Sequence, residues 1–308
     1  MDASVAPPRG APGRPGRYFD PVVLARISNL GLRARHVVEG LMAGLHRSSL
    51  RGLSVEFSEH RPYAPGDELR RIDWKLFGRQ DRYFVKEYEA ETNLRAHLFV
   101  DASASMRYAG DAAGFSKFDC AATIAASLAY LMLLQRDAVG LVVMREEGPR
   151  VLAPRSQPHH LHAIIAELEA ARPAGRTDVR AALAEIAGGL HRRGLCVLIS
   201  DLLDDPEGLA LGLRHLHHRR NDLMVLQVAD RDELDLPFRK VTRFVDLEEP
   251  LELTTDPREI RDEYRAAVAE HLARVRELCR RAGADHDLIV TDEPLDAALV
   301  RYLARRGG

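Results

Sequence analysis

Five short apolar runs, separated by segments with helical periodicity, constrain the fold of this 308-residue chain more than any other feature. The runs lack the alternation of polar and apolar residues seen in half-exposed strands, so we expect both faces of each strand to be buried. Strands that alternate with helices are typical of a mostly parallel sheet covered by helices on both faces. The sequence therefore predicts an α/β fold with strands at 96–100, 138–144, 195–200, 223–229 and 287–291.

The segments between these runs carry the expected helices. Residues 118–135 are apolar on nearly all sides, which predicts a central buried helix. Residues 161–168 have the spacing of an amphipathic helix. Asp256 and Pro257 form a helix start, and Gly283 is expected to end the long helix that follows. Two further helices are predicted at 177–190 and 206–220.

The first 94 residues have a different character. Residues 1–17 are rich in proline and glycine without periodicity, which predicts a disordered tail. Asp20 and Pro21 are expected to start an arm helix that reaches about Leu45, either continuous or broken near Gly31. Two short strands are predicted at 53–57 and 82–88, joined by a long connection at 60–80 that is a candidate working surface. The expected division is a tail at 1–17, an arm helix with a β-rich segment at 18–94, and an α/β domain at 95–308.

Composition excludes several classes of protein. A formal net charge of -2 and a pI near 6.7 give no overall attraction to nucleic acid or to an anionic membrane. The N-terminus lacks the apolar core of a signal peptide, and no window reaches the roughly 18 apolar residues that a membrane span requires. The three cysteines lie far apart, which predicts buried thiols in a reducing compartment. We therefore expect a cytoplasmic protein.

Oxygen-bearing side chains follow two of the predicted strands. Asp101, Ser103 and Ser105 come directly after the first strand, Asp201 closes the third, and Thr177 opens a helix. Ligands of open α/β sheets bind beyond the carboxyl ends of the strands, and oxygen donors without His or Cys favour Mg²⁺ or Mn²⁺ over Zn²⁺. The alternatives are structural, with short polar side chains that satisfy a turn and with Thr177 as the N-cap of its helix.

The order Asp-x-Ser-x-Ser, then Thr, then Asp resembles the metal-ion-dependent adhesion site of von Willebrand factor A domains. The resemblance implies a von Willebrand A-like fold, with Ser103 and Ser105 as direct Mg²⁺ ligands. It also implies that Thr177 binds the ion in the ligand-bound state, and that Asp101 and Asp201 act directly or through water. A partner's carboxylate would complete the octahedron, so the ion is expected to bind weakly until that partner arrives.

The segment upstream resembles the bacterial domain of unknown function 58 family, whose pattern is approximately R-x-Y-x-P-G-D-x-x-R-x-I-D-W. Proteins of that family are commonly paired with MoxR-type AAA+ ATPases and are thought to act as adaptors in chaperone-like or assembly functions. Many members of the family carry transmembrane helices; this chain differs from them in that it is expected to be a soluble version. The alternative interpretation is a structural salt-bridge network around the single Trp. The matching residues are Arg61, Tyr63, Pro65, Gly66, Asp67, Arg70, Ile72, Asp73 and Trp74.

The expected function is a non-enzymatic, Mg²⁺-dependent adaptor whose partner, a MoxR-type ATPase or its client, presents an acidic side chain. Nucleic acid is not an expected partner. One rival is a metal-dependent hydrolase that uses the same oxygens with Asp204 or Asp230 as base. Another is a structural A-like domain with a vacant site. Two histidine clusters are interpreted as solvated helix surfaces and not as metal ligands, namely His159, His160 and His162, and His215, His217 and His218.

Overall fold

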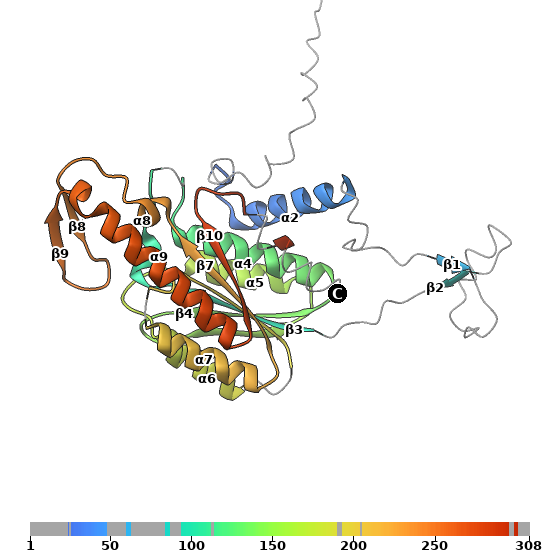
Figure 1. The fold of residues 1–308 in the computed structure, drawn as a ribbon. Coiled ribbons are helices and arrows are strands. Elements are labelled where there is room, and N and C mark those ends of the chain that lie inside the picture. Colours follow the sequence, from blue (N-terminus) through green and yellow to red (C-terminus); the bar gives the residue numbers. More distant parts are fainter. Residues whose placement is uncertain are drawn as a thin grey trace, which may run out of the picture.

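The computed structural model describes residues 24, 26–47, 60–62, 84–86, 94–111, 114–189, 193–203, 205–295 and 299–300. Its centre is a six-stranded sheet in the order β10-β7-β6-β3-β4-β5 (Figure 1). Five strands run parallel and β5 pairs antiparallel with β4 at one edge, which confirms the predicted mostly parallel α/β sheet. The strands are β3 (Arg95–Asp101), β4 (Ala138–Met144), β5 (Arg150–Arg155), β6 (Leu195–Ser200), β7 (Asp222–Ala229) and β10 (Ala284–Val290).

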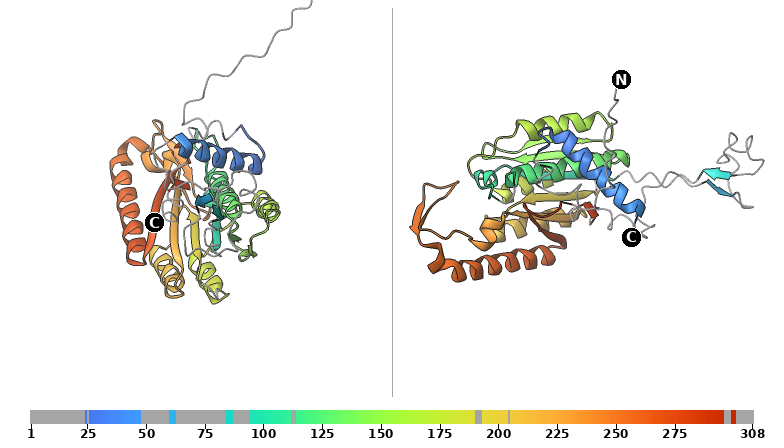
Figure 2. Two further views of the ribbon diagram at one scale, coloured as in Figure 1. Left: turned by 90° about the vertical axis from the view of Figure 1, so that its right-hand side faces the viewer. Right: turned by 90° about the horizontal axis from the view of Figure 1, so that it is seen from above.

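Both faces of the sheet are buried at its central strands β3, β4, β6 and β7, which explains why these strands lack polar alternation. Leu98 of β3 joins the apolar cluster on one face and its neighbour Phe99 joins the cluster on the other; neither has exposed surface. Helices α4 and α5 cover the first face with α2 packed against them, and α6, α7 and α9 lie on the second face (Figures 1 and 2). The helices are α2 (Leu30–Arg47), α4 (Lys117–Leu134), α5 (His160–Ala170), α6 (Val179–Gly189), α7 (Pro206–His218) and α9 (Pro257–Arg281).

Helix α4 is the central apolar helix that the sequence predicts. Its N-cap is Ser116, whose side chain accepts a hydrogen bond from the backbone N–H of Asp119, while the Asp119 carboxylate accepts one from the Ser116 backbone. By length and composition α4 is long enough and apolar enough to cross a membrane, which corrects the expectation that no segment qualifies. However, 83% of this window is buried inside the protein, as in the core helix of a globular domain.

The N-terminal segments are described only in part. The apolar side of α2 belongs to the same core cluster as α4, so this helix is packed onto the sheet domain. An antiparallel pair is formed by β1 (His60–Pro62) and β2 (Phe84–Lys86). Strand β2 lies within the strand predicted at 82–88, whereas β1 lies in the predicted connection and the strand predicted at 53–57 lies outside the described residues. The predicted tail at 1–17 and Trp74 lie outside the described residues.

Some elements of the described chain were not predicted. They are the edge strand β5 and the elements between β7 and α9, a stretch for which the sequence predicts no helix or strand. Their strands are short and half exposed, so their sequences carry little apolar periodicity. The elements after β7 are the short helix α8 (Arg231–Asp235) and a hairpin of β8 (Thr242–Val245) and β9 (Glu252–Thr255).

Two glycines offer a matched test of the packing. A Cβ at Gly194, just before β6, would clash with the backbone carbonyl oxygen of Arg95, whereas a Cβ at Gly188 of α6 would meet no atom within 4 Å. We expect Gly194→Ala to lower the free energy of unfolding by about 1–3 kcal/mol, because neither backbone can move without breaking the β3–β6 ladder. Gly188→Ala should raise it by about 0.5–1 kcal/mol. Urea unfolding measures both, and equal effects would contradict the strand packing described.

Candidate functional site

The candidate site lies where β3 ends, in the middle of the carboxyl edge of the sheet. Strand β3 ends at Asp101 between β4 and β6, and the chain then enters a short 3-10 helix, η3 (Ala104–Arg107). The backbone N–H of Ala102 donates to the carbonyl oxygen of Met144, which holds this turn against β4. Because the strand is central, only 2% of Asp101 is exposed.

Both carboxylate oxygens of Asp101 accept hydrogen bonds. Oδ1 accepts the backbone N–H of Ser103 at 2.9 Å and the hydroxyl of Thr177 at 2.8 Å, and Oδ2 accepts the hydroxyl of Ser200 at 2.6 Å. Burial, and then the negative charge of Asp201, raise the pKa of Asp101 to about 6, although the hydrogen bonds oppose this shift. Two buried carboxylates at one edge create a negative potential that a cation would relieve.

Of the three hydroxyl groups of the predicted site, that of Thr177 contacts the Asp101 carboxylate, and those of Ser103 and Ser105 contact each other. The hydroxyl oxygens of Ser103 and Ser105 are 3.0 Å apart. The alternative interpretation of Thr177 as a helix N-cap is wrong, because Asp178 has that role: its carboxylate accepts the backbone N–H of Ala181 at 2.8 Å. Thr177 is buried and its hydroxyl is directed at Asp101.

A buried lysine pairs with the last predicted site residue, Asp201. Lys117, the first residue of α4, has no exposed surface, and its ammonium group lies 2.8 Å from Asp201 Oδ2 and 2.5 Å from Glu233 Oε1. Burial by itself lowers the pKa of Lys117, but the two carboxylates outweigh it and hold this pKa above its ordinary value. The lysine therefore stays charged at neutral pH and partly neutralises the site.

The sequence predictions missed three of these contacting residues, namely Lys117, Ser200 and Glu233. Lys117 had a detectable signal, since it is a lone cation at the start of an otherwise apolar helix. Ser200, the last residue of β6, had none, because its role follows only from lying beside β3 in the sheet.

The donor set fits a hard divalent cation. Hydrogen bonds bring together Asp101, Ser103, Ser105 and Thr177, and the charge of Asp201 acts on Asp101. Carboxylate and hydroxyl oxygens are ligands that Mg²⁺ accepts. One feature opposes binding, because the Lys117 ammonium already holds one oxygen of Asp201. Among the described residues, no group of three or more His, Cys, Asp or Glu is arranged to hold a metal.

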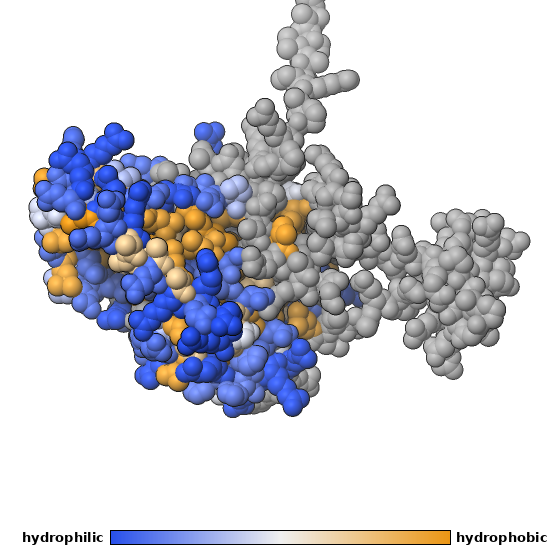
Figure 3. Space-filling model, viewed as in Figure 1, coloured by the Kyte–Doolittle hydropathy of each residue, from blue (hydrophilic) through white to orange (hydrophobic). Residues whose placement is uncertain are grey.

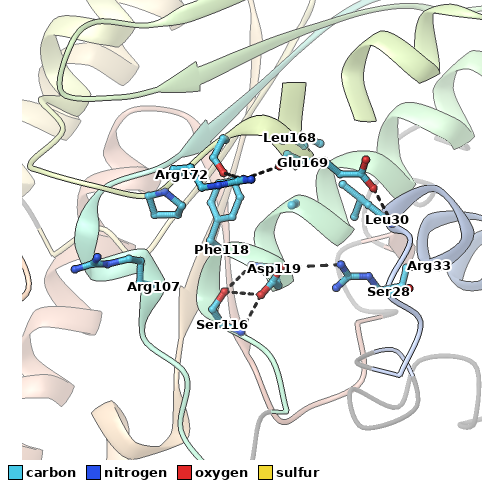
Figure 4. A pocket seen from close by; sticks show the side chains of 13 residues that line it. Ser28, Leu30, Arg33, Arg107, Ser116, Phe118, Asp119, Leu168, Glu169 and Arg172 are labelled. Atoms are coloured by element: carbon cyan, nitrogen blue, oxygen red, sulfur yellow. Dashed lines mark hydrogen bonds and ion pairs between the residues drawn. The ribbon is translucent and has the colours of Figure 1, made fainter. Parts of the chain in front are cut away.

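A pocket of about 450 Å³ opens near the site, between α2, α4 and α5 (Figure 4). Its lining includes Arg107 of η3, two residues after Ser105. Arg33 points toward Asp119 across the pocket, with 4.0 Å between its Nη2 and the carboxylate oxygen Oδ1. Glu169 accepts the backbone N–H of Leu30 at the start of α2. The charged lining residues thus also hold helix ends together, which is a structural role.

Comparison with known proteins places the chain in a family. The pattern of the family described as "Protein of unknown function DUF58" matches residues 59–274, more than half of the chain. The chain belongs to the DUF58 family. This membership confirms the resemblance predicted from the motif at 61–74.

The chain is also similar to individual proteins. The uncharacterized protein Rv1480 of Mycobacterium tuberculosis is 29% identical over 296 residues, which cover 94% of this chain and 92% of that protein. Among solved structures, the hypothetical protein BatB of Bacteroides thetaiotaomicron has a TM-score of 0.47 at 14% identity and covers 70% of this chain and 98% of its own. The VWA domain of SpRpn10 has a TM-score of 0.41 at 10% identity, over 68% and 95%.

Proposed function

We propose that this DUF58 protein is a non-enzymatic adaptor that docks an acidic side chain of a protein partner through Mg²⁺. The observation that carries the proposal is the set of hydrogen bonds on Asp101, which draws η3, the Thr177 loop and β6 to one point at the edge of the sheet. Bound there, the ion would supply an open coordination position for a carboxylate. The residues that would hold it are Asp101, Ser103, Ser105, Thr177 and Asp201.

The arrangement favours docking over hydrolysis. A hydrolase needs a general base near the metal. Asp230 is unsuited to this task, because it is 1% exposed and its oxygens accept the backbone N–H of Gly110, the backbone N–H of Asp232 and the hydroxyl of Thr291. The other candidate base, Asp204, lies outside the described residues.

The proposed partner is a MoxR-type AAA+ ATPase, or a client of one, in the cytoplasm. Family membership supports this proposal, since DUF58 proteins are commonly paired with such ATPases. The carboxylate that completes the metal site would come from an Asp or Glu on the partner's surface.

A pulldown from a bacterial lysate tests the proposal. We expect the wild-type protein to retain a partner in Mg²⁺ and to lose it in EDTA. Ser105→Ala, which removes one proposed ligand, should weaken Mn²⁺ binding by at least about tenfold, measured by electron paramagnetic resonance, and should lose the same partner. Ser156→Ala, at an exposed serine far along the chain from η3, is the control. Retention of the partner in EDTA and by Ser105→Ala would refute metal-dependent docking and favour a purely structural domain.

A further inference from the structure

The β8–β9 hairpin contacts the candidate site through its tip, residues 246–251. A carboxylate oxygen of Glu248 accepts the backbone N–H of Ser105 at 3.3 Å. The next residue, Glu249, forms an ion pair of 3.1 Å with Arg176, which directly precedes Thr177. Two consecutive acidic residues of one loop therefore contact both segments that carry the hydroxyl groups of the site.

The tip is shaped by its own hydrogen bonds. One carboxylate oxygen of Asp246 accepts the backbone N–H groups of Glu248 at 2.7 Å and Glu249 at 2.9 Å. The backbone N–H of Asp246 donates to the carbonyl oxygen of Leu251 at 2.9 Å, which closes the loop. This Asp-centred turn holds the backbone of Glu248 through hydrogen bonds made within the tip itself.

The hairpin is weakly anchored to the rest of the protein. Its apolar side chains gather at the left edge of the view in Figure 3 and are largely exposed. Near its base, the Phe244 ring packs edge-on against Phe238, with the ring centroids 5.7 Å apart. Segments with few buried apolar contacts open at low free-energy cost, so the tip can leave the site without disrupting the core. The exposed side chains are Val241, Val245, Leu247, Leu251 and Leu253.

We propose that Glu248 is an internal ligand that occupies the docking position of the site, so that a partner's acidic side chain must displace it. This inference rests on the proposed function, because it assigns a regulator to the same site. A tethered carboxylate competes at an effective concentration in the millimolar range. The hairpin would thereby exclude weak acidic ligands and admit only a partner that binds more tightly.

A peptide copied from the tip, residues 244–253 (FVDLEEPLEL), provides the probe. In saturating Mn²⁺ we expect the fluorescently labelled peptide to bind the full-length Glu248→Gln protein about tenfold more tightly than the wild type. The factor corresponds to the loss of one charge-assisted hydrogen bond between residue 248 and the site, which the peptide no longer has to displace. The control is Glu252→Gln, which alters another exposed acid of the hairpin, 3.7 Å from Arg243, and should leave peptide affinity unchanged. Fluorescence anisotropy measures the affinity.

The outcomes separate this inference from the proposed function. If the peptide binds the wild type and Glu248→Gln with equal affinity, or binds neither protein, the proposed role of Glu248 is overturned. If Mn²⁺ alone binds the wild type and is lost in Ser105→Ala, the metal site stands whatever the peptide does. If Mn²⁺ does not bind the wild type, the proposed function fails, and the internal ligand fails with it.

Discussion

Lys117→Met will lower the free energy of unfolding by about 3–5 kcal/mol, the range expected when one partner of a buried ion pair is removed. The methionine fills a similar volume but leaves the Asp201 and Glu233 carboxylates without the cation that lies within 2.8 Å of each. Of these two side chains, Asp201 is 5% exposed and Glu233 28%, so water replaces the lost cation poorly. Urea unfolding at pH 7.5 in metal-free buffer measures the effect.

An exposed ion pair supplies the control for this substitution. Arg150 and Glu167 lie 3.2 Å apart, with 58% of the arginine side chain exposed. Arg150→Met should change the free energy of unfolding by no more than about 1 kcal/mol, because exposed pairs contribute little.

We also expect Mg²⁺ to stabilise Lys117→Met more than the wild type, since the ion no longer competes with an ammonium group for Asp201. An effect of Lys117→Met as small as that of Arg150→Met would show that the buried network contributes little to the fold.

Asp101→Asn will remove the pH-dependent decrease in the free energy of unfolding that the ionised Asp101 carboxylate causes in the metal-free protein. The pKa of Asp101 is raised to about 6 in the folded state, from an ordinary value of 3.8, so the folded state binds this proton more tightly than the unfolded state. The resulting stabilisation is fully present below pH 4 and is lost as the pH rises through 6. One pKa unit corresponds to 1.36 kcal/mol, so above pH 6 the ionised carboxylate costs about 3 kcal/mol.

The difference in the free energy of unfolding between the wild type and Asp101→Asn separates the titration of Asp101 from that of all other groups. Relative to the variant, the metal-free wild type should lose about 1–2 kcal/mol of stability between pH 5 and pH 7.5. Mg²⁺ should restore that stability in the wild type and have no effect in Asp101→Asn. Asp262→Asn, at an exposed position of α9, should follow the wild-type pH profile. A difference that is the same at both pH values would mean that hydrogen bonding, and not charge, governs this position.

The sequence alone indicated five of the six strands of the sheet, all but the edge strand β5. The strands β3, β4, β6 and β7 are local apolar runs, and β10 ends in one; a run that must be buried on both faces is recognisable without knowledge of its neighbours. The rule that ligands bind at the carboxyl edge then placed Asp101, Ser103 and Ser105 together, because they follow one strand within five residues. The signature at 61–74 indicated the DUF58 family for the same reason, since all of its residues lie in one short segment.

Only the tertiary structure decided which side chains surround Asp101. Ser200 reaches it across 99 residues of sequence, Lys117 reaches Asp201 across 84, and Glu248 reaches Ser105 across 143. A local pattern records whether a residue is apolar and how it is spaced, but it does not record which distant group lies opposite. The charge balance of the site, and the hairpin that contacts it, arise from long-range contacts that form only when the sheet assembles.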